Sequence, residues 1–217
     1  MQSWLVCLLR LLETGECKFH MPSPIMHAAM GYVVYKAFEP DSTRSRFGKI
    51  GRIPILLVIS LAASLLPDLD SVYGILAGDF GRYHNNATHS LIVGLLVALL
   101  FTGGVSVLFK KFEFWTIFLV ILVSYQAHII MDFFTISRGV MALWPLSLER
   151  FVSPISLFYG FHWSDGLFSI RHLWTFLSES IKAVILILTI NYLTSRKLKK
   201  GIFGERSVIV SKRSEKT

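Results

Sequence analysis

Charged residues are scarce in this 217-residue chain: they make up 17% of the sequence, whereas hydrophobic residues make up 53%. Because a soluble domain carries about 25% charged residues, this deficit excludes an ordinary soluble protein and predicts an integral membrane protein. The net charge is nevertheless +8. The basic residues lie in short segments beside apolar runs, which is typical of residues that orient a protein in a membrane. The expected partner is therefore the lipid bilayer, and no nucleic acid is expected.

Cysteine is also rare, with Cys7 and Cys17 as the two examples. Their spacing fits no zinc motif, and two cysteines cannot form a disulfide framework. The apolar stretch 4–12 is too short to span a membrane, and it lacks the basic start and cleavage site of a signal peptide. We therefore predict that residues 1–20 are an N-terminal extension. It is either a short amphipathic segment on the membrane surface or sequence upstream of a native start at Met21.

Motifs of several common enzyme classes are missing as well. The chain has no His-Glu-x-x-His helix, no Gly-x-Ser-x-Gly elbow and no phosphate-cradling glycine loop. Ser90 directly follows His89 and could act as a nucleophile. Because serine is a favoured residue at the start of a helix, we predict instead that Ser90 caps the helix that follows it.

Five apolar segments are present, at 25–38, 53–66, 91–109, 114–134 and 176–193. The first two would form helices of roughly 21 Å, shorter than the ~30 Å hydrocarbon core, and are either short tilted spans or helices packed inside the protein. Pro54 is placed to start the second helix and Pro67 to end it. A polar loop is expected at 71–88, and a long covering loop at 135–172. The pattern predicts an all-α fold: a polytopic membrane helical bundle with one domain at 21–195 and a basic tail at 196–217.

The basic clusters indicate how such a bundle is oriented. They lie at 44–52, at Lys110-Lys111 and in the tail. If the tail is cytoplasmic, alternation through five crossings places all three clusters on that side, as basic residues near spans require. The same alternation gathers seven histidines and aspartates at the opposite, non-cytoplasmic end: His27, Asp68, Asp70, His84, His89, His128 and Asp132.

Taken singly, these residues have ordinary explanations. His128 and Asp132 are four residues apart, so they share a helix face and could simply be a hydrogen-bonded core pair. Asp68 and Asp70 could cap a turn, and His27 could be a satisfied core histidine. Their convergence changes the interpretation, because ionisable groups beside hydrocarbon are expensive and therefore indicate function.

A mixed set of imidazoles and carboxylates suits zinc, manganese or iron. Seven side chains are more than one tetrahedral zinc needs, so we predict two or more divalent metal ions, with zinc favoured. Two-metal sites use aspartates to bridge the ions and lower the pKa of bound water to about 7. The first hypothesis is therefore a metal-dependent hydrolase. The alternatives are a metal transporter or sensor, whose ligands should lie near the bilayer midplane, and a structural membrane protein.

The motifs that carry these residues resemble a known family. They are Pro22-Ser23-Pro24-Ile25-x-His27, Pro67-Asp68-Leu69-Asp70, His84-x4-His89-Ser90, His128-x3-Asp132 and Trp144-Pro145. From Met21 to about Leu193 the chain resembles the LexA-regulated, membrane-bound metal-dependent hydrolases of the bacterial inner membrane, which are distantly similar to zinc-dependent phospholipase C and P1 nuclease. The resemblance implies hydrolysis of a phosphoester or lipid-linked substrate at the periplasmic face. It also implies the following metal ligands: His27, Asp68, His84, His128 and Asp132.

In the same resemblance, His89 and Asp70 are ligands or partners that orient the ligands. We assign the catalytic work to Asp68, Asp132 and His89. The chain departs from the family in one place. The family usually reads His-Arg-Gly-x-Thr-His-Ser, and here Asn85 and Asn86 replace the arginine and glycine. An arginine that could clamp a phosphate is therefore missing. Two further residues fall in the same outer region and are either part of the site or surface residues: His162 and Asp165.

Overall fold

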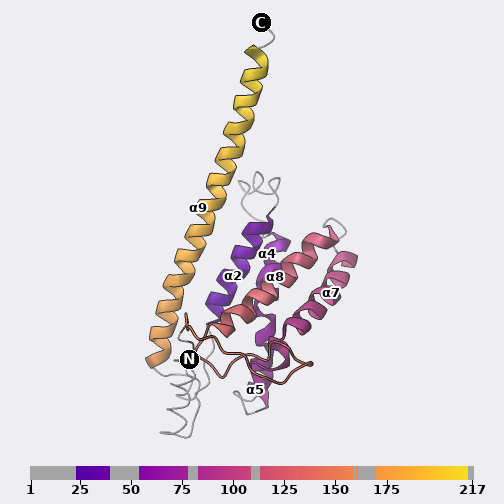
Figure 1. Ribbon diagram of the computed structural model, residues 1–217, viewed down its shortest axis with the longest axis vertical. Helices are drawn as coiled ribbons and strands as arrows, with labels where there is room; N and C mark the ends of the chain where they lie inside the picture. The colour runs from indigo at the N-terminus through magenta and orange to yellow at the C-terminus, as the bar shows by residue number, and fades with distance from the viewer. Residues whose placement is uncertain are drawn as a thin grey trace.

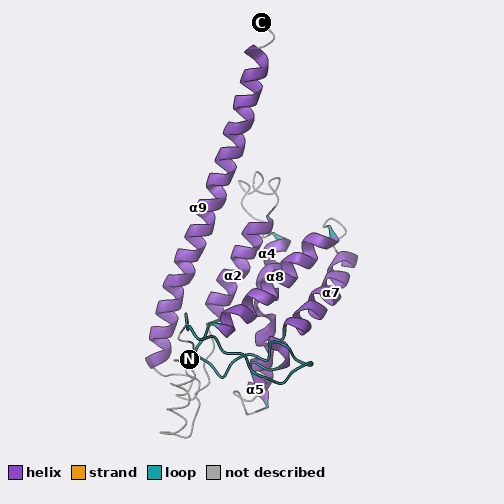
Figure 2. Ribbon diagram, in the orientation of Figure 1, coloured by secondary structure: helices purple, strands orange, loops and turns teal. Residues whose placement is uncertain are grey.

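The computed structural model describes residues 23–39, 54–77, 83–108, 113–158, 160 and 170–214, with the backbone alone for 108, 171 and 196–214. Several predictions lie outside the described residues: those for the extension 1–20 with its cysteines, the basic loop at 44–52, Lys110-Lys111, His162 and Asp165. Within the described part the fold is all-α, with isolated β-bridges and no strand (Figures 1 and 2). The prediction of an all-α membrane bundle is confirmed.

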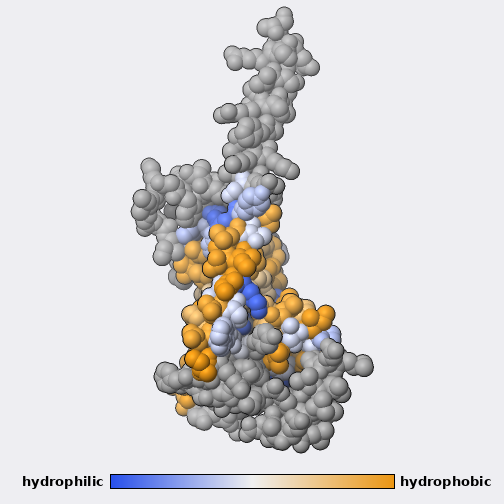
Figure 3. All heavy atoms as spheres, turned by 90° about the vertical axis from the view of Figure 1, so that its left-hand side faces the viewer, coloured by the Kyte–Doolittle hydropathy of each residue, from blue (hydrophilic) through white to orange (hydrophobic). Residues whose placement is uncertain are grey.

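The helices follow one another in this order: α2 (Pro24–Phe38), α4 (Ile55–Leu65), η1 (Leu66–Asp68), α5 (Leu69–Leu76), η2 (Ala87–His89), α7 (Leu91–Leu108), α8 (Phe114–Phe133) and α9 (Ile170–Ser214). Three helical segments are long and apolar enough to cross a membrane: Ile55–Leu76, Phe114–Phe133 and His172–Ser195. The large apolar side chains on their outer faces are exposed, as with Trp115 at 68% and Leu188 at 63%. Figure 3 shows such side chains gathered over the described face on which α9 lies.

Pro67 does not end the second helix, which corrects the sequence prediction. The chain continues through the 3₁₀ turn η1 into α5, so that Ile55–Leu76 forms one helical segment and residues 71–76 are helix rather than loop. Proline is tolerated because it lies at the first positions of η1, where a backbone N–H has no helical partner in any case. As a result Asp68 and Asp70 are held by a helix and not by a loop.

The predicted span 91–109 forms α7, which runs from Leu91 to Leu108, the last described residue before a gap, so this prediction is confirmed over the described residues. One other boundary differs from expectation. The last helix is longer than predicted, since α9 begins at Ile170 and continues through the basic tail to Ser214. Ser90 does cap α7 as predicted, because its Oγ accepts the backbone N–H groups of Ile92 at 3.2 Å and Val93 at 3.5 Å.

Helix α8 lies at the centre of the bundle and packs against α2, α4 and α7, while α9 packs against α2 (Figure 1). Small residues bring these helices close together. A Cβ atom on Gly31 of α2 would lie 2.6 Å from Ser64 Oγ of α4, and one on Gly94 of α7 would lie 2.7 Å from the Tyr125 ring of α8. Small residues at membrane helix interfaces allow such close approach. Here the approach brings two pairs of helices into contact, α2 with α4 and α7 with α8.

The helices alternate in direction, so one end of the bundle collects the first turn of α2, the end of α4 with η1 and α5, the start of α7 and the end of α8. The described part of the loop after α8, residues 135–158, passes across this same end (Figure 1). Its backbone is joined to the first residue of α7, because Leu91 N donates to Ala142 O at 2.9 Å. The loop therefore covers the end of the bundle where the predicted ligands lie.

Candidate metal centre

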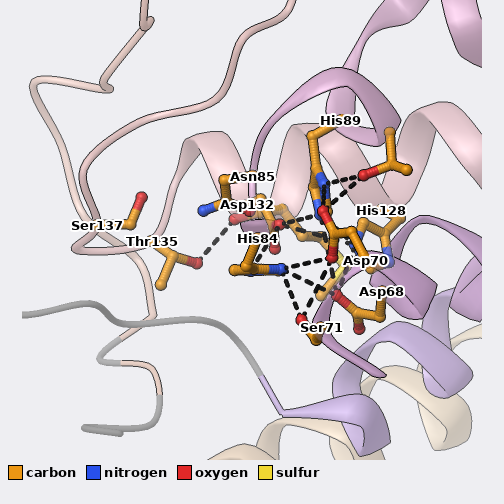
Figure 4. A network of polar contacts seen from close by, with 12 residues as sticks. Asp68, Asp70, Ser71, His84, Asn85, His89, His128, Asp132, Thr135 and Ser137 are labelled. Carbon is orange, nitrogen blue, oxygen red and sulfur yellow. Dashed lines mark hydrogen bonds and ion pairs between the residues drawn. The ribbon is translucent and has the colours of Figure 1, made fainter. Parts of the chain in front are cut away.

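All seven predicted ligands meet at this end of the bundle. Figure 4 labels all of them except His27. His27 comes from the first turn of α2, and His128 and Asp132 from the last turns of α8. Asp68 ends η1, Asp70 lies in the first turn of α5, and His84 and His89 lie before α7. The four imidazoles and Asp132 are almost fully buried, with exposures of 6% or less. The sequence expectation that these residues converge is met.

The ligands divide into two groups that share one carboxylate. In each group, atoms that could bind a metal lie within 4.8 Å of one another. The first group consists of Asp68, His84, His89 and Asp132, and the second of His27, His128 and Asp132. Asp132 is the one member that they have in common.

The two oxygens of Asp132 are directed to different partners. Oδ1 lies 3.4 Å from His27 Nε2, in the second group. Oδ2 lies 2.9 Å from His89 Nε2, in the first group, and 3.6 Å from His128 Nε2. A carboxylate between two clusters of imidazole nitrogens has the arrangement of a bridging ligand, as in two-metal sites. Asp68 Oδ1, at 3.4 Å from His128 Nε2, brings a second carboxylate to the same space.

Asp70 belongs to neither group, but it orients two of the histidines. Its Oδ1 lies 3.0 Å from His84 Nδ1, its Oδ2 lies 3.2 Å from His89 Nδ1, and Thr88 donates to Oδ2 at 2.6 Å. An ionised carboxylate can only accept, so Nδ1 carries the hydrogen in both rings. Each Nε2 is then free to bind a metal, which is the usual role of a carboxylate behind a metal-binding histidine.

His128 is oriented in the same way by the backbone. Its Nδ1 donates to the carbonyl oxygen of Ser64, at 2.7 Å, and its Nε2 faces His89 Nε2 at 3.1 Å. The ring of His128 also stacks on that of His27, with centroids 3.7 Å apart. This stacking joins α2 to α8, while the Ser64 carbonyl oxygen of α4 holds the His128 ring. The packing of the helices thus sets the spacing between the two groups.

Several polar atoms at the centre are buried and lack a well-aligned hydrogen-bond partner among the described residues: His84 Nε2, Asp68 Oδ1 and both oxygens of Asp132, although Oδ2 lies 2.9 Å from His89 Nε2. Leaving a buried polar group unsatisfied costs about 1–3 kcal/mol, and more for a charged one. The atoms belong to the donor types that bind zinc, manganese or iron, and they point into one shared space. The residues present therefore fit a divalent cation, which would satisfy all of them together.

The electrostatics of the centre also favour a cation. Burial by itself would lower the pKa of His89, but its hydrogen bonds to Asp132 and Asp70 outweigh that effect and raise the pKa to about 9. Such a raised histidine pKa indicates a negative electrostatic potential around the ring. A metal ion would meet the same potential and would displace that proton on binding.

The loop between His84 and His89 is held by two arginines that the sequence analysis did not single out. Arg138 donates to the carbonyl oxygen of His84, and Arg150 donates to the Asn86 side chain and, at 3.1 Å, to the carbonyl oxygen of Asn85. Asn85 has a φ of 59°, a left-handed conformation that asparagine tolerates better than most residues. Both arginines come from the covering loop and are bonded to the segment between His84 and His89. Two arginines within a largely apolar loop were the signal that could have identified them.

A family model described as "YdjM inner membrane protein" matches residues 21–202, which is most of the chain. Comparisons with curated proteins and with solved structures gave no match. The matched region contains all the helical segments that are long and apolar enough to span a membrane, together with every member of the two ligand groups. The chain therefore belongs to the YdjM family of inner membrane proteins.

Proposed function

We propose that this membrane protein is a metal-dependent hydrolase whose centre holds two divalent cations, with zinc as the first candidate. The observation that carries the proposal is the position of Asp132, which is shared by the two groups of ligands: its Oδ1 lies near His27, and its Oδ2 lies near His89 and His128. When bound, the cations supply Lewis acidity that activates water and offsets charge on a phosphoester.

Each residue of the centre has a role in this proposal. Asp68, His84, His89 and Asp132 would hold one cation, and His27, His128 and Asp132 the other. Asp70 keeps His84 and His89 in the tautomer that presents Nε2. Asp68 is the most exposed ligand, with 16% of its side chain accessible, so it lies where a substrate would approach.

We place the centre on the periplasmic side of the inner membrane, with the C-terminal tail in the cytoplasm. The ends of α2 and α7 that lead to the basic segments are opposite the centre. Basic residues are enriched on the cytoplasmic side of membrane proteins. A fusion reporter attached after Ser214 tests this orientation: alkaline phosphatase should be inactive there and a cytoplasmic reporter active, and the reverse result would contradict the placement.

The proposed substrate is an amphiphilic phosphoester such as a phospholipid. An apolar cavity of about 310 Å³ lies between α7, α8 and the covering loop, a volume within the range of small-molecule pockets. Its lining includes Leu91, two residues after His89, and Phe133, next to Asp132. Every lining residue is apolar. We infer that the cavity receives part of an acyl chain while the headgroup lies at the metal centre.

Activity in defined vesicles tests the proposal. Zinc-loaded protein should release phosphorylated headgroups from phospholipid, detected by mass spectrometry, and Asp132→Ala should abolish the release. Glu149→Gln, which changes an exposed carboxylate on the covering loop, is the matched control. Leu143→Trp, which narrows the cavity, should lower hydrolysis of phospholipid more than hydrolysis of the soluble diester bis(p-nitrophenyl) phosphate. Equal turnover by wild type and Asp132→Ala would contradict a hydrolase that uses this centre.

The arrangement is less suited to a metal transporter. The ligands gather at one end of the bundle, and the polar residues further inside are bonded to one another: Ser60 Oγ contacts Ser124 Oγ at 2.9 Å and donates to the Gly31 carbonyl oxygen at 2.6 Å. Beyond them an apolar cluster of Tyr35, Leu56 and Val120 fills the bundle. A transported ion would need polar groups along the whole path. These features support a site open to one side of the membrane.

A further inference from the structure

His27 differs from the other three histidines of the centre in the surroundings of its outer nitrogen. Nδ1 of His84 and His89 contacts Asp70, and Nδ1 of His128 contacts the Ser64 carbonyl oxygen. Nδ1 of His27 is buried and has no hydrogen-bond partner among the described residues. Yet its Nε2 is directed at Asp132 Oδ1 like that of a ligand. The ring therefore needs a partner on its outer side to hold that orientation.

Glu179 of α9 contacts the start of α2, where α9 packs against that helix. It lies in the apolar segment His172–Ser195 and is fully buried, with 0% of its surface exposed. One oxygen, Oε2, accepts the backbone N–H of Ser23 at 2.5 Å. The other, Oε1, is buried without a partner in the described part of the chain. A buried carboxylate in a membrane-spanning helix is costly and indicates a functional role.

Ser23 connects Glu179 to His27. It precedes α2, and its carbonyl oxygen accepts the backbone N–H of His27 at 3.4 Å, one turn further along. Side chains of a helix lean towards its N-terminus, so the His27 ring lies over the turn that begins at Ser23. The Oγ atom of Ser23 is also buried without a partner. Three unsatisfied polar atoms, on Ser23, His27 and Glu179, thus gather at the first turn of α2.

We propose that Glu179 is a positioning residue for the metal centre, acting on His27 through Ser23. In this proposal the Ser23 hydroxyl, which forms neither bond in the structure, turns to accept the Nδ1 hydrogen of His27 and to donate its own hydrogen to Glu179 Oε1, which would satisfy all three atoms. Glu179 then does for His27 what Asp70 does for His84 and His89. The inference rests on the proposed metal centre, and it assigns α9 a part in the centre although α9 supplies no ligand.

Zinc affinity measured by chelator competition on the full-length protein in detergent tests this role. Ser23→Ala and Glu179→Leu should weaken the site that contains His27 by about 10–100-fold, the usual effect of losing a partner behind a metal ligand. The other site should keep its affinity. Ser23→Thr keeps a hydroxyl and should restore binding. Glu39→Gln is the matched control, because Glu39 is a buried carboxylate at the far end of α2.

Distinct outcomes separate this inference from the proposed function. Unchanged affinity at both sites in Ser23→Ala would overturn the inference while leaving the metal centre intact. Equal loss at both sites in Glu179→Leu, matched by Glu39→Gln, would overturn it in favour of a purely structural role. Wild-type protein that binds no zinc would overturn the proposed function and the inference with it.

Discussion

Asp132→Asn should separate the contribution of the negative charge of this shared carboxylate from the contribution of its size. The change preserves the volume of the side chain but removes the negative charge that faces both ligand groups. Asp132 is buried, with 1% of its surface exposed, and a neutral amide of similar size is less costly to bury than a carboxylate, so the substituted protein should fold. With zinc present, the same substitution weakens both sites together.

The size of the effect follows from binding linkage. Zinc at 100 times its Kd stabilises the folded protein by about 2.7 kcal/mol for each site. If Asp132→Asn raises each Kd by about 10–100-fold, the same zinc concentration stabilises by only about 0.4–1.4 kcal/mol for each site. The loss should be at least this large, because Asp132 is proposed as a direct ligand and not only as an orienting partner.

The assay is thermal unfolding in detergent, followed by tryptophan fluorescence, with and without zinc after treatment with a chelator. Wild type should show a large zinc-dependent rise in Tm, and Asp132→Asn a small one. His27→Ala, which removes a ligand from the second group alone, should show an intermediate rise. A zinc-dependent rise in Asp132→Asn equal to that of wild type would refute the assignment of Asp132 as a shared ligand.

Three further predictions test other parts of the centre. Asp70→Asn should weaken the first site by about 10–100-fold and spare the second, because Asp70 orients only His84 and His89; chelator competition would show this, and equal weakening of both sites would contradict it. Zinc binding at pH 7.5 should release the proton that His89 holds with a pKa of about 9, and zinc affinity should rise with pH up to that value. Calorimetry in buffers of different ionisation enthalpy measures the proton release, and binding without proton release at pH 7.5 would argue against His89 as a ligand. Gly31→Leu should lower Tm and zinc content, because even a Cβ there would lie 2.6 Å from Ser64 Oγ; unchanged zinc content would show that the close packing of α2 on α4 does not set the site.

Much of the fold could be predicted from the sequence, because apolar runs and basic flanks are local features. The five apolar segments gave the helices α2, α4, α7, α8 and α9, and their alternation placed the ligands at one end. The continuation of the helix through Pro67 was missed, because proline is compatible both with the end of a helix and with the first positions of a new 3₁₀ turn. Helix α9 was predicted too short, since basic residues do not by themselves end a helix.

The candidate site was predictable in its membership but not in its geometry. The spacing of His128 and Asp132 on one helix is local and was read correctly as one face. The division into two groups was not, because it depends on how far α2 and α8 are rotated about their axes when they pack. The role of Asp70 behind two histidines, and the position of Glu179 beside α2, are likewise contacts between segments far apart in the chain. No local pattern reports such contacts.

The measurement that tests the central claim most directly is the metal content of the detergent-purified protein by elemental analysis, after reconstitution with zinc. The account predicts two zinc ions per chain in wild type, one in His27→Ala and less than one in Asp132→Ala, with every variant checked for folding. A wild-type protein that binds no zinc, or zinc that remains at two ions per chain in folded Asp132→Ala, would contradict a two-ion centre that shares this carboxylate.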